Sequence, residues 1–313
     1  MRLFFLMIML CTVGCSSTKK DSIPQETRAV KIDLVFLREI RGDIFNIPLR
    51  QPYGLALDYK GNVFLTDAGN NRIIKFDQDL KPLKQIGGFG SSEGQFNTPT
   101  FLSFDNGLNL MVSDEKNRRV ARFNSQLIYV DQLDFTDEED PLKFGYPSGV
   151  TFTNYGEVWV ADRDNNQIVI FNNIGQYSHS LGEFGASGGQ LISPEKIIHD
   201  ELDNFIVCDA GNKRIVKYDS YGSFVTSYKN SEFVYPISVI LQKQKIFVLD
   251  SELGSIFCLD KNGQMLDEIP SLLLGDKTQL LNPSDFIFLA PDKILIADTD
   301  NNRLVLGKLI IEE

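Results

Sequence analysis

Residues 52–72, PYGLALDYKGNVFLTDAGNNR, contain one copy of a pattern that returns throughout the chain. Its first proline recurs every 42 to 48 residues, and an aspartate about fifteen residues later keeps the same period. The prolines are Pro52, Pro99, Pro147, Pro194, Pro236 and Pro283, and the aspartates are Asp67, Asp114, Asp162, Asp209, Asp250 and Asp298. A period of about 40 to 50 residues built from short apolar runs is typical of a β-propeller with one four-stranded blade per repeat. The sequence therefore predicts an all-β, six-bladed propeller.

The apolar residues inside each repeat have the spacing of short strands. Leu55 and Leu57 alternate after the first proline, and alternation with period two indicates a strand that packs one face against a neighbour. Gly61-Asn62 stands where a hairpin has to turn. Ile73 and Phe76 open a further strand, and the other repeats have β-branched or aromatic residues at most of the same positions. We expect each blade to pack on the next through these side chains.

An Asp-x-x-Asn-x-Arg turn separates the second and third predicted strands. It reads Asp67-Ala-Gly-Asn-Asn-Arg72 in the first repeat and returns almost unchanged in residues 209–214 and 298–303. Asp and Asn favour tight turns because their side chains bond nearby backbone amides, and a guanidinium suits a carboxylate. One interpretation is a ring of arginines that binds a ligand. We favour a structural clasp, since a residue repeated in most blades serves a need that every blade shares.

Two links between repeats match closely and suggest a family. Residues 87–99 and 182–194 share the pattern Gly-x-Phe-Gly, Gly-Gln and Pro. Together with the proline period and the Asp-x-x-Asn-x-Arg turn, these links resemble the NHL repeat, over residues 31–311 or so. This resemblance implies a six-bladed propeller, and usually a surface that binds other molecules. Some relatives of the fold are enzymes.

The two ends of the repeat region suggest how the ring closes. The sixth repeat supplies three strands and then the chain stops. Residues 31–40, KIDLVFLREI, look like a strand without a repeat of their own. We expect this segment to complete the last blade, because an open ring would leave two blade faces without a packing partner. Residues 31–313 are thus predicted to form one propeller domain.

The first thirty residues suggest an exported protein. Arg2 precedes an apolar run too short to span a bilayer, and Thr12-Val13-Gly14-Cys15 follows it. Small residues before a cysteine resemble a bacterial lipobox, with residues 1–14 as the signal peptide and Cys15 as the lipidated residue. Residues 15–30 would then tether the propeller to the cell envelope, most simply to the outer membrane on its periplasmic side. The alternative is an ordinary secretory signal without a lipid.

Composition narrows the choice of partners. The chain has 31 basic and 42 acidic residues, for a formal net charge of −11. A body this acidic repels phosphate backbones, so we do not expect a nucleic-acid partner, although some NHL proteins have one. The acidic run of residues 137–140 is expected to be a solvated loop, and it lacks the ligand spacing of a calcium loop. Cys208 and Cys258 occupy different places in the repeat, so we expect two buried free thiols.

Residues suited to chemistry are scarce. The chain has two histidines, His179 and His199. His199 takes a position filled by apolar residues in most other repeats, so we expect a packed core histidine rather than a metal ligand. The zinc ligands of amidating lyases, which share the six-bladed fold, are therefore not expected. A lactonase-like calcium site would need several carboxylate or amide oxygens at the channel, where only Glu195 and Asp285 are acidic. Lys196 stands beside Glu195 and would neutralise it, and removing both carboxylates would relieve any repulsion between them.

The sequence thus favours a monomeric propeller that binds a protein or glycan without a cofactor, catalytic residue or metal. The expected binding face is the one that carries the prolines and the Asp–Arg turns, because both kinds of loop emerge there. Aromatic and basic residues are enriched at binding hot spots. The candidate binding residues are Tyr53, Phe101, Arg118, Tyr146, Arg163, Glu195, Lys196, Lys213 and Asp285. The alternative function is a calcium-dependent hydrolase of the lactonase type, acting through Glu195 and Asp285.

Overall fold

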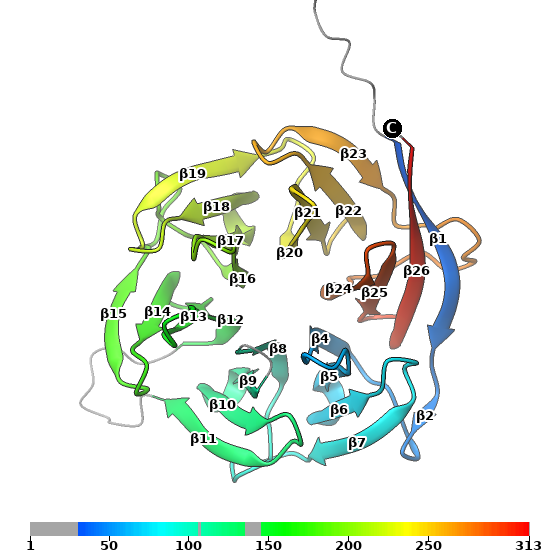
Figure 1. The fold of residues 1–313 in the computed structure, drawn as a ribbon, viewed down its shortest axis with the longest axis horizontal. Coiled ribbons are helices and arrows are strands. Elements are labelled where there is room, and N and C mark those ends of the chain that lie inside the picture. Colours follow the sequence, from blue (N-terminus) through cyan, green and yellow to red (C-terminus); the bar gives the residue numbers. More distant parts are fainter. Residues whose placement is uncertain (1–30, 106–107, 135–144, 313) are drawn as a thin grey trace, which may run out of the picture.

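The computed structural model of the chain describes residues 31–105, 108–134 and 145–312. These residues form six four-stranded antiparallel sheets, arranged as blades around a central axis (Figure 1). The first strand of each blade lies nearest the axis in blades one to six (Figure 1). The predicted six-bladed fold is therefore confirmed. Cys15 and the acidic run of residues 137–140 lie outside the described residues.

The first three blades follow the order of the chain from the axis outward. Their strands are β4 (Pro52–Leu57), β5 (Val63–Asp67), β6 (Arg72–Phe76) and β7 (Pro82–Gly87), then β8 (Pro99–Phe104), β9 (Asn109–Asp114), β10 (Arg119–Asn124) and β11 (Tyr129–Asp134), then β12 (Pro147–Phe152), β13 (Val158–Asp162), β14 (Gln167–Phe171) and β15 (Tyr177–Leu181).

The remaining blades keep the same order, except that the outer strand of the last blade comes from the N-terminal side of the chain. Their strands are β16 (Pro194–His199), β17 (Phe205–Asp209), β18 (Arg214–Tyr218) and β19 (Phe224–Lys229), then β20 (Pro236–Gln242), β21 (Lys245–Asp250), β22 (Ser255–Leu259) and β23 (Met265–Ile269), then β24 (Asp285–Ala290), β25 (Lys293–Asp298), β26 (Arg303–Glu312) and β1 (Lys31–Ile40). A small hairpin, β2 (Asp43–Ile44) and β3 (Ile47–Pro48), precedes blade one.

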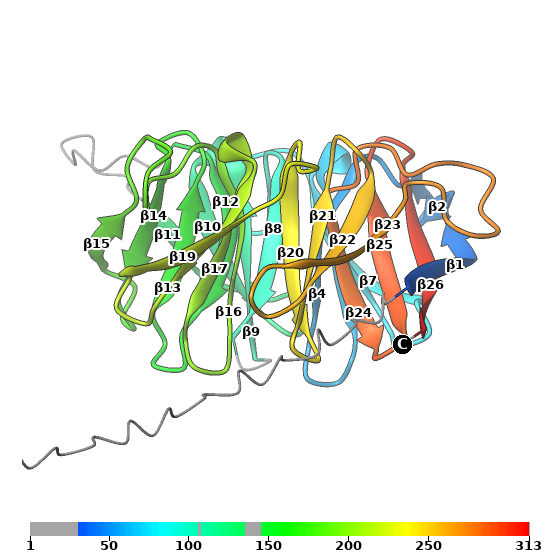
Figure 2. The same cartoon turned by 90° about the horizontal axis from the view of Figure 1, so that it is seen from above.

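The ring has two distinct faces, which the side view separates (Figure 2). On the proline face, each first strand begins and each second strand ends, so that Pro52 pairs with Asp67 in blade one. Three single-turn helices lie there, η1 (Ala68–Asn70), η2 (Glu115–Asn117) and η3 (Ala210–Asn212). On the opposite side, which we call the hairpin face, a turn connects the first strand of each blade to the second.

Neighbouring blades pack through large aromatic side chains at some positions and through close backbone approach at others. Trp159 of blade three stacks on Phe205 of blade four, with the ring centroids 3.5 Å apart and the rings 9° from parallel. Gly54 allows the closest backbone approach between blades one and two, since a Cβ at this position would lie 2.5 Å from the Thr100 carbonyl oxygen. Cys208 and Cys258 are buried free thiols, as predicted. The blades are thus closely packed both where aromatic rings stack and where glycine lets two backbones approach.

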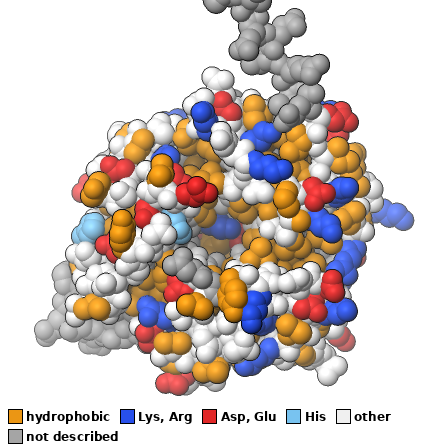
Figure 3. Space-filling view, in the orientation of Figure 1, with side chains coloured by type: hydrophobic (Ala, Val, Ile, Leu, Met, Phe, Trp, Pro, Cys, Tyr) orange, Lys and Arg blue, Asp and Glu red, His pale blue; other side chains and the backbone are white. Residues whose placement is uncertain are grey.

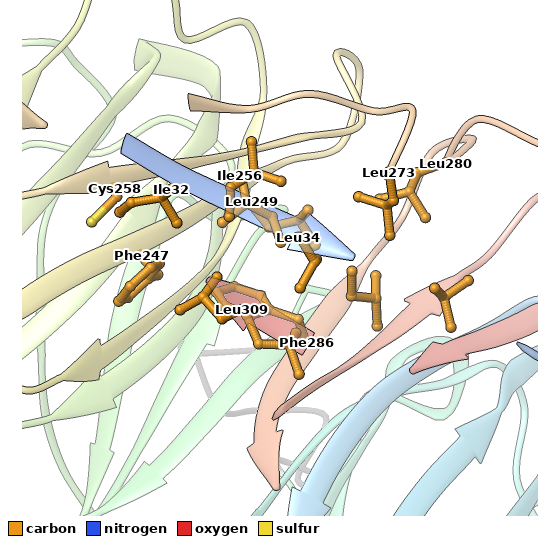
Figure 4. Close-up of a cluster of buried hydrophobic side chains, with 14 of the residues drawn as sticks. Ile32, Leu34, Phe247, Leu249, Ile256, Cys258, Leu273, Leu280, Phe286 and Leu309 are labelled. Atoms are coloured by element: carbon orange, nitrogen blue, oxygen red, sulfur yellow. The ribbon is translucent and has the colours of Figure 1, made fainter. Parts of the chain in front are cut away.

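Strand β1 completes blade six, as the sequence predicted. It pairs antiparallel with β26 from Lys31–Glu312 to Ile40–Leu304. Ile32 and Leu34 are only 2% and 1% exposed, and they join an apolar cluster that includes residues of blade five (Figure 4). Beyond that cluster, the Phe36 amide donates to the Leu274 carbonyl at 2.8 Å, and the Leu274 amide donates to the Leu34 carbonyl at 3.1 Å. The closing strand therefore joins blade five as well as blade six.

Candidate functional site

In four of the six blades, the Asp–Arg turn is a clasp that ties the blade to the segment before it. In blade four, the Arg214 Nε donates to Asp209 Oδ2 at 2.6 Å, while Asp209 Oδ1 accepts the Ile192 amide at 2.7 Å. Both side chains are buried. The guanidinium also donates to carbonyl groups of the link, such as that of Gln190 at 2.7 Å. Matching ion pairs join Arg72 to Asp67 at 2.6 Å, Arg119 to Asp114 at 2.8 Å and Arg303 to Asp298 at 2.5 Å.

The guanidinium groups of these arginines donate their hydrogen bonds to other groups of the protein, which supports the structural interpretation. Burial raises the pKa of Asp209, and the hydrogen bonds from Ile192 and Arg214 oppose that rise. A buried carboxylate needs such partners to remain charged. The clasp arginines are therefore not available to a ligand in the four blades that have them.

The channel mouth on the proline face holds a different group of charges, which we call the mouth network: Tyr53, Glu115, Arg163, Glu195 and Tyr235. Arg163 of blade three lies between two carboxylates, 2.8 Å from Glu115 of blade two and 3.3 Å from Glu195 of blade four. The Tyr235 hydroxyl of blade five donates to Glu195 Oε1 at 2.8 Å. Five blades thus contribute to the mouth network.

Local structure explains how these side chains are aimed. Glu195 follows Pro194 at the start of β16, and its side chain is 1% exposed. The Tyr235 amide donates to the blade-five aspartate Asp250 at 2.8 Å, which holds the tyrosine at the entrance to β20. Arg163 directly follows the turn aspartate Asp162, and its amide donates to the Tyr146 carbonyl at 3.0 Å. The turns that clasp the blades therefore also position the mouth network.

Burial dominates the electrostatics of the mouth network. It raises the pKa of Glu195, against the opposing effects of Arg163 and of the Tyr235 hydrogen bond. It also raises the pKa values of Tyr53 and Tyr235, so both phenols stay protonated near neutral pH. Glu195 Oε2 is buried and has no hydrogen-bond partner among the described residues. The network therefore contains one acceptor that is still unsatisfied.

A second ion pair lies next to the mouth network and corrects one expectation. Lys196 Nζ lies 2.6 Å from Asp285 Oδ1, so the lysine pairs with Asp285 rather than with its sequence neighbour Glu195. Asp285 also accepts from the Ser238 hydroxyl at 2.7 Å and from the Leu55 amide at 2.9 Å. Each carboxylate thus has its own cation. Figure 3 shows one face of the ring hollowed at its centre, with a basic side chain visible inside the hollow.

The other predicted binding residues fall into different environments. Phe101 is 2% exposed and packs edge-on against Tyr53, with ring centroids 5.2 Å apart, so its predicted exposure is wrong. Its strand neighbours Thr100 and Leu102 are buried as well, because this end of β8 packs between neighbouring blades on both of its faces. Arg118 and Lys213 are exposed, with φ of 54° and 55°, just after η2 and η3. Tyr146 is half-buried beside Pro147.

Sequence reasoning missed four residues of the proline face, namely Glu115, Tyr235, Phe89 and Phe184. Glu115 and Arg163 occupy the same repeat position in adjacent blades, directly after the turn aspartate, and their opposite charges were a readable signal. Tyr235 directly precedes a repeat proline, as Tyr146 does. Phe89 and Phe184 lie in the two matching links and are 73% and 70% exposed.

The described residues hold no group of three or more His, Cys, Asp or Glu placed to bind a metal. His199 is half-buried rather than fully packed, and its Nδ1 lies 2.9 Å from the Thr151 hydroxyl of the neighbouring blade. Within the described ranges, no helix is long and apolar enough to cross a membrane.

Comparison with known proteins supports the fold assignment. A family model described as a 6-bladed beta-propeller matches residues 136–235. The Drosophila melanogaster protein brain tumor is 28% identical over 127 residues, which cover 40% of this chain and 12% of that protein. Human NHL repeat-containing protein 3 is 28% identical over 164 residues, covering 46% of this chain and 47% of its own length. The chain therefore spans about half or less of these curated relatives.

Solved structures show the same architecture at low identity. Virginiamycin B lyase from Staphylococcus aureus, solved with quinupristin, has a TM-score of 0.63 at 14% identity, covering 90% of this chain and 100% of that one. A putative gluconolactonase has a TM-score of 0.65 at 13% identity, covering 90% of this chain and 93% of that one. Likeness at this level concerns the fold alone. The chain is a six-bladed β-propeller with NHL-repeat homologues.

Proposed function

We propose that this propeller is an envelope-anchored binding module that holds a protein or glycan partner on its proline face. The observation that carries the proposal is the exposure of Phe89 and Phe184, at 73% and 70%, in matching links of that face. Large aromatic rings left in solvent are costly to keep and effective in recognition, because they bury much area with few rotatable bonds. The exposed Arg118 and Lys213 add basic groups to the same face.

The mouth network gives that face a fixed centre. Arg163 is tied to Glu115 and Glu195, and these bonds hold the surrounding blade ends in one arrangement. A preorganised surface loses little conformational entropy when a partner binds. The aromatic links stand around a rigid centre, and this suits a scaffold that captures a partner without changing it.

The alternative, a calcium-dependent hydrolase of the lactonase type, has less support. A calcium ion requires several oxygen ligands that are free to coordinate it. Glu195 is bonded to Arg163 and Tyr235, and Asp285 is bonded to Lys196, Ser238 and the Leu55 amide. Calcium would have to displace two cations to reach both carboxylates, which lie in separate ion pairs.

Site-specific photo-crosslinking tests the binding face. A photoreactive phenylalanine in place of Phe89 or Phe184 should crosslink the protein to one defined partner in envelope fractions. If the partner is a glycan, the protein should bind a polysaccharide on a glycan array. The matched control is the same residue at Tyr155, which is 81% exposed at a hairpin on the other face. Equal capture from both faces would contradict the proposal. Calcium binding in calorimetry that Asp285→Asn abolishes would favour the hydrolase.

The anchoring part of the proposal has its own test. Cys15→Ser should release the protein from membranes, because the substitution removes the sulfur that a lipid would modify. Membrane fractionation and detergent partitioning measure the outcome. A variant that partitions as the wild type does would contradict lipidation at Cys15.

A further inference from the structure

A cavity of about 630 Å³ lies between blades four and five, on the hairpin face and away from the mouth network. His199, Lys217 and Tyr228 of blade four form one side of it. Leu241, Lys243 and Ile246 of blade five form part of the other side. Small-molecule sites commonly have volumes of about 300 to 1,000 Å³, so this cavity has the size of a ligand site.

The cavity has a local origin in the shape of blade five. Its inner hairpin turns through only two residues, Lys243 and Gln244, with φ of 47° and 60°, and Gln242 pairs directly with Lys245. The equivalent hairpin of blade four is longer, since the Asp200 amide donates to the Asn204 carbonyl at 2.9 Å across three intervening residues. A short hairpin beside a longer one leaves the space between their tips unfilled.

The walls combine an apolar floor with a charged rim that contains both lysines and acidic residues. Ile206 and Ile246 line the cavity while remaining 3% exposed, so the floor is sealed by the core. Three lysines line it as well, Lys217, Lys243 and Lys261. Asp200 and Glu201 also line the cavity, so its lining holds three basic and two acidic side chains in a chain with a net charge of −11.

Two of these lysines are available to a ligand. Lys217 is engaged, because its Nζ lies 3.2 Å from Asp200 Oδ2. Lys243 and Lys261 have no ion-pair partner within the part of the chain that the structure describes. An ammonium group at the edge of an apolar pocket favours a ligand that brings a carboxylate.

His199 adds a neutral polar contact rather than a charge. Its Nδ1 is engaged with the Thr151 hydroxyl at 2.9 Å, and burial lowers the pKa of the ring despite the nearby Asp203 and Asp200. The imidazole is therefore uncharged near neutral pH. It would hydrogen-bond a ligand without competing with the lysines for its negative charge.

We propose that this cavity binds a small amphipathic carboxylate. The apolar or aromatic body of the ligand lies against Leu241, Ile206 and Ile246, and its carboxylate lies between Lys243 and Lys261. This site is separate from the proline face and does not depend on the function proposed for that face.

The test compares 2-naphthoate with its neutral analogue 2-naphthamide, which has the same ring and no charge. Saturation-transfer NMR and ligand fluorescence titration of the full chain measure the affinities. The wild type should prefer the naphthoate. Lys243→Gln and Lys261→Gln should each weaken naphthoate binding by about tenfold while leaving naphthamide unchanged, since a charge-assisted hydrogen bond is lost. Lys293→Gln is the matched control, because this exposed lysine lies beside the inner hairpin of blade six.

A second variant tests whether the ligand binds inside the cavity. Leu241→Trp fills the space from blade five and should abolish binding of both compounds, with the thermal unfolding curve showing that the ring remains folded. Three outcomes would overturn the proposal: no binding of naphthoate, equal binding of the two compounds, or naphthoate binding that is unaffected by both lysine substitutions.

Discussion

Asp285 Oδ1 lies 2.6 Å from Lys196 Nζ, so a carboxylate of blade six is paired with a lysine of blade four. The same carboxylate accepts from Ser238 of blade five at 2.7 Å and from the Leu55 amide of blade one at 2.9 Å. One buried side chain thus connects four blades around the channel. It follows that Asp285 matters to the ring as a whole and not only to blade six.

Asp285→Asn should lower the free energy of unfolding by about 3–5 kcal/mol, because the substitution leaves the Lys196 ammonium unpaired in a buried setting. From the sequence, we expected that removing the two channel carboxylates would stabilise the fold by relieving their repulsion. Because Asp285 is paired with Lys196, its loss is now expected to destabilise the fold. Urea denaturation measures the change. Asp292→Asn, at a carboxylate with a side chain that is 52% exposed, should change stability by no more than about 0.5 kcal/mol. Equal stability of the two variants would contradict the role of Asp285.

Glu195 should make the protein less stable as the pH rises above 4.5, its ordinary pKa. Burial raises the pKa of Glu195 in the folded state, so the folded chain holds this proton more tightly than the unfolded chain. The cost of ionisation is absent below 4.5 and complete above the raised folded pKa. The stability of Glu195→Gln relative to the wild type should therefore improve across that window. Chemical denaturation at a series of pH values measures it, and a pH-independent difference would contradict this assignment.

The closing strand offers a matched pair of leucines. Leu34 is 1% exposed and Leu37 is 45% exposed on the same strand. Leu34→Ala should cost about 2–5 kcal/mol, since it leaves a cavity in the cluster shared with blade five. Leu37→Ala should cost much less. Circular dichroism melting compares them, and deletion of residues 31–40 should lower the melting temperature further. A normal melting curve after that deletion would contradict closure by β1.

The clasp can be tested at two adjacent residues of blade four. Arg214→Met should destabilise the protein by about 3–5 kcal/mol, because Asp209 is then buried without its cation. Lys213→Asn should be nearly neutral, as Asn tolerates the left-handed conformation that Lys213 adopts at φ 55°. Guanidinium denaturation monitored by tryptophan fluorescence gives both values. Destabilisation by Lys213→Asn alone would show that the turn, and not the ion pair, holds the link.

The fold was predictable because every blade repeats the same requirements. Pro52 and Asp67 pair across the first two strands, and blades two to five have the same pair at nearly the same distance along the chain. Closure by residues 31–40 was predictable too, since the sixth repeat lacked a strand and only one strand-like segment remained. These features depend on backbone geometry, which the period of a sequence records well.

The candidate site was predictable only in part, because it depends on which side chains meet across the channel. Glu195 and Asp285 were found by position, yet Lys196 reaches Asp285 and leaves Glu195 to Arg163. Phe101 was expected to be exposed because it stands two residues after a repeat proline, but the start of β8 is buried and Phe101 is 2% exposed. Neighbours along a strand face opposite ways, and small differences in twist decide which one reaches a partner in another blade.

Among the described strands, β1 is synthesised before all the others and paired last, because its partner β26 ends at Glu312. The segment from Lys31 to Glu312 must therefore be synthesised before the ring is sealed, and a product that lacks β26 cannot pair with β1. Long-range pairing of this kind slows folding and favours completion after translation. The seam thus makes the native ring depend on both β1 and β26, since neither blade six nor the ring is complete without them.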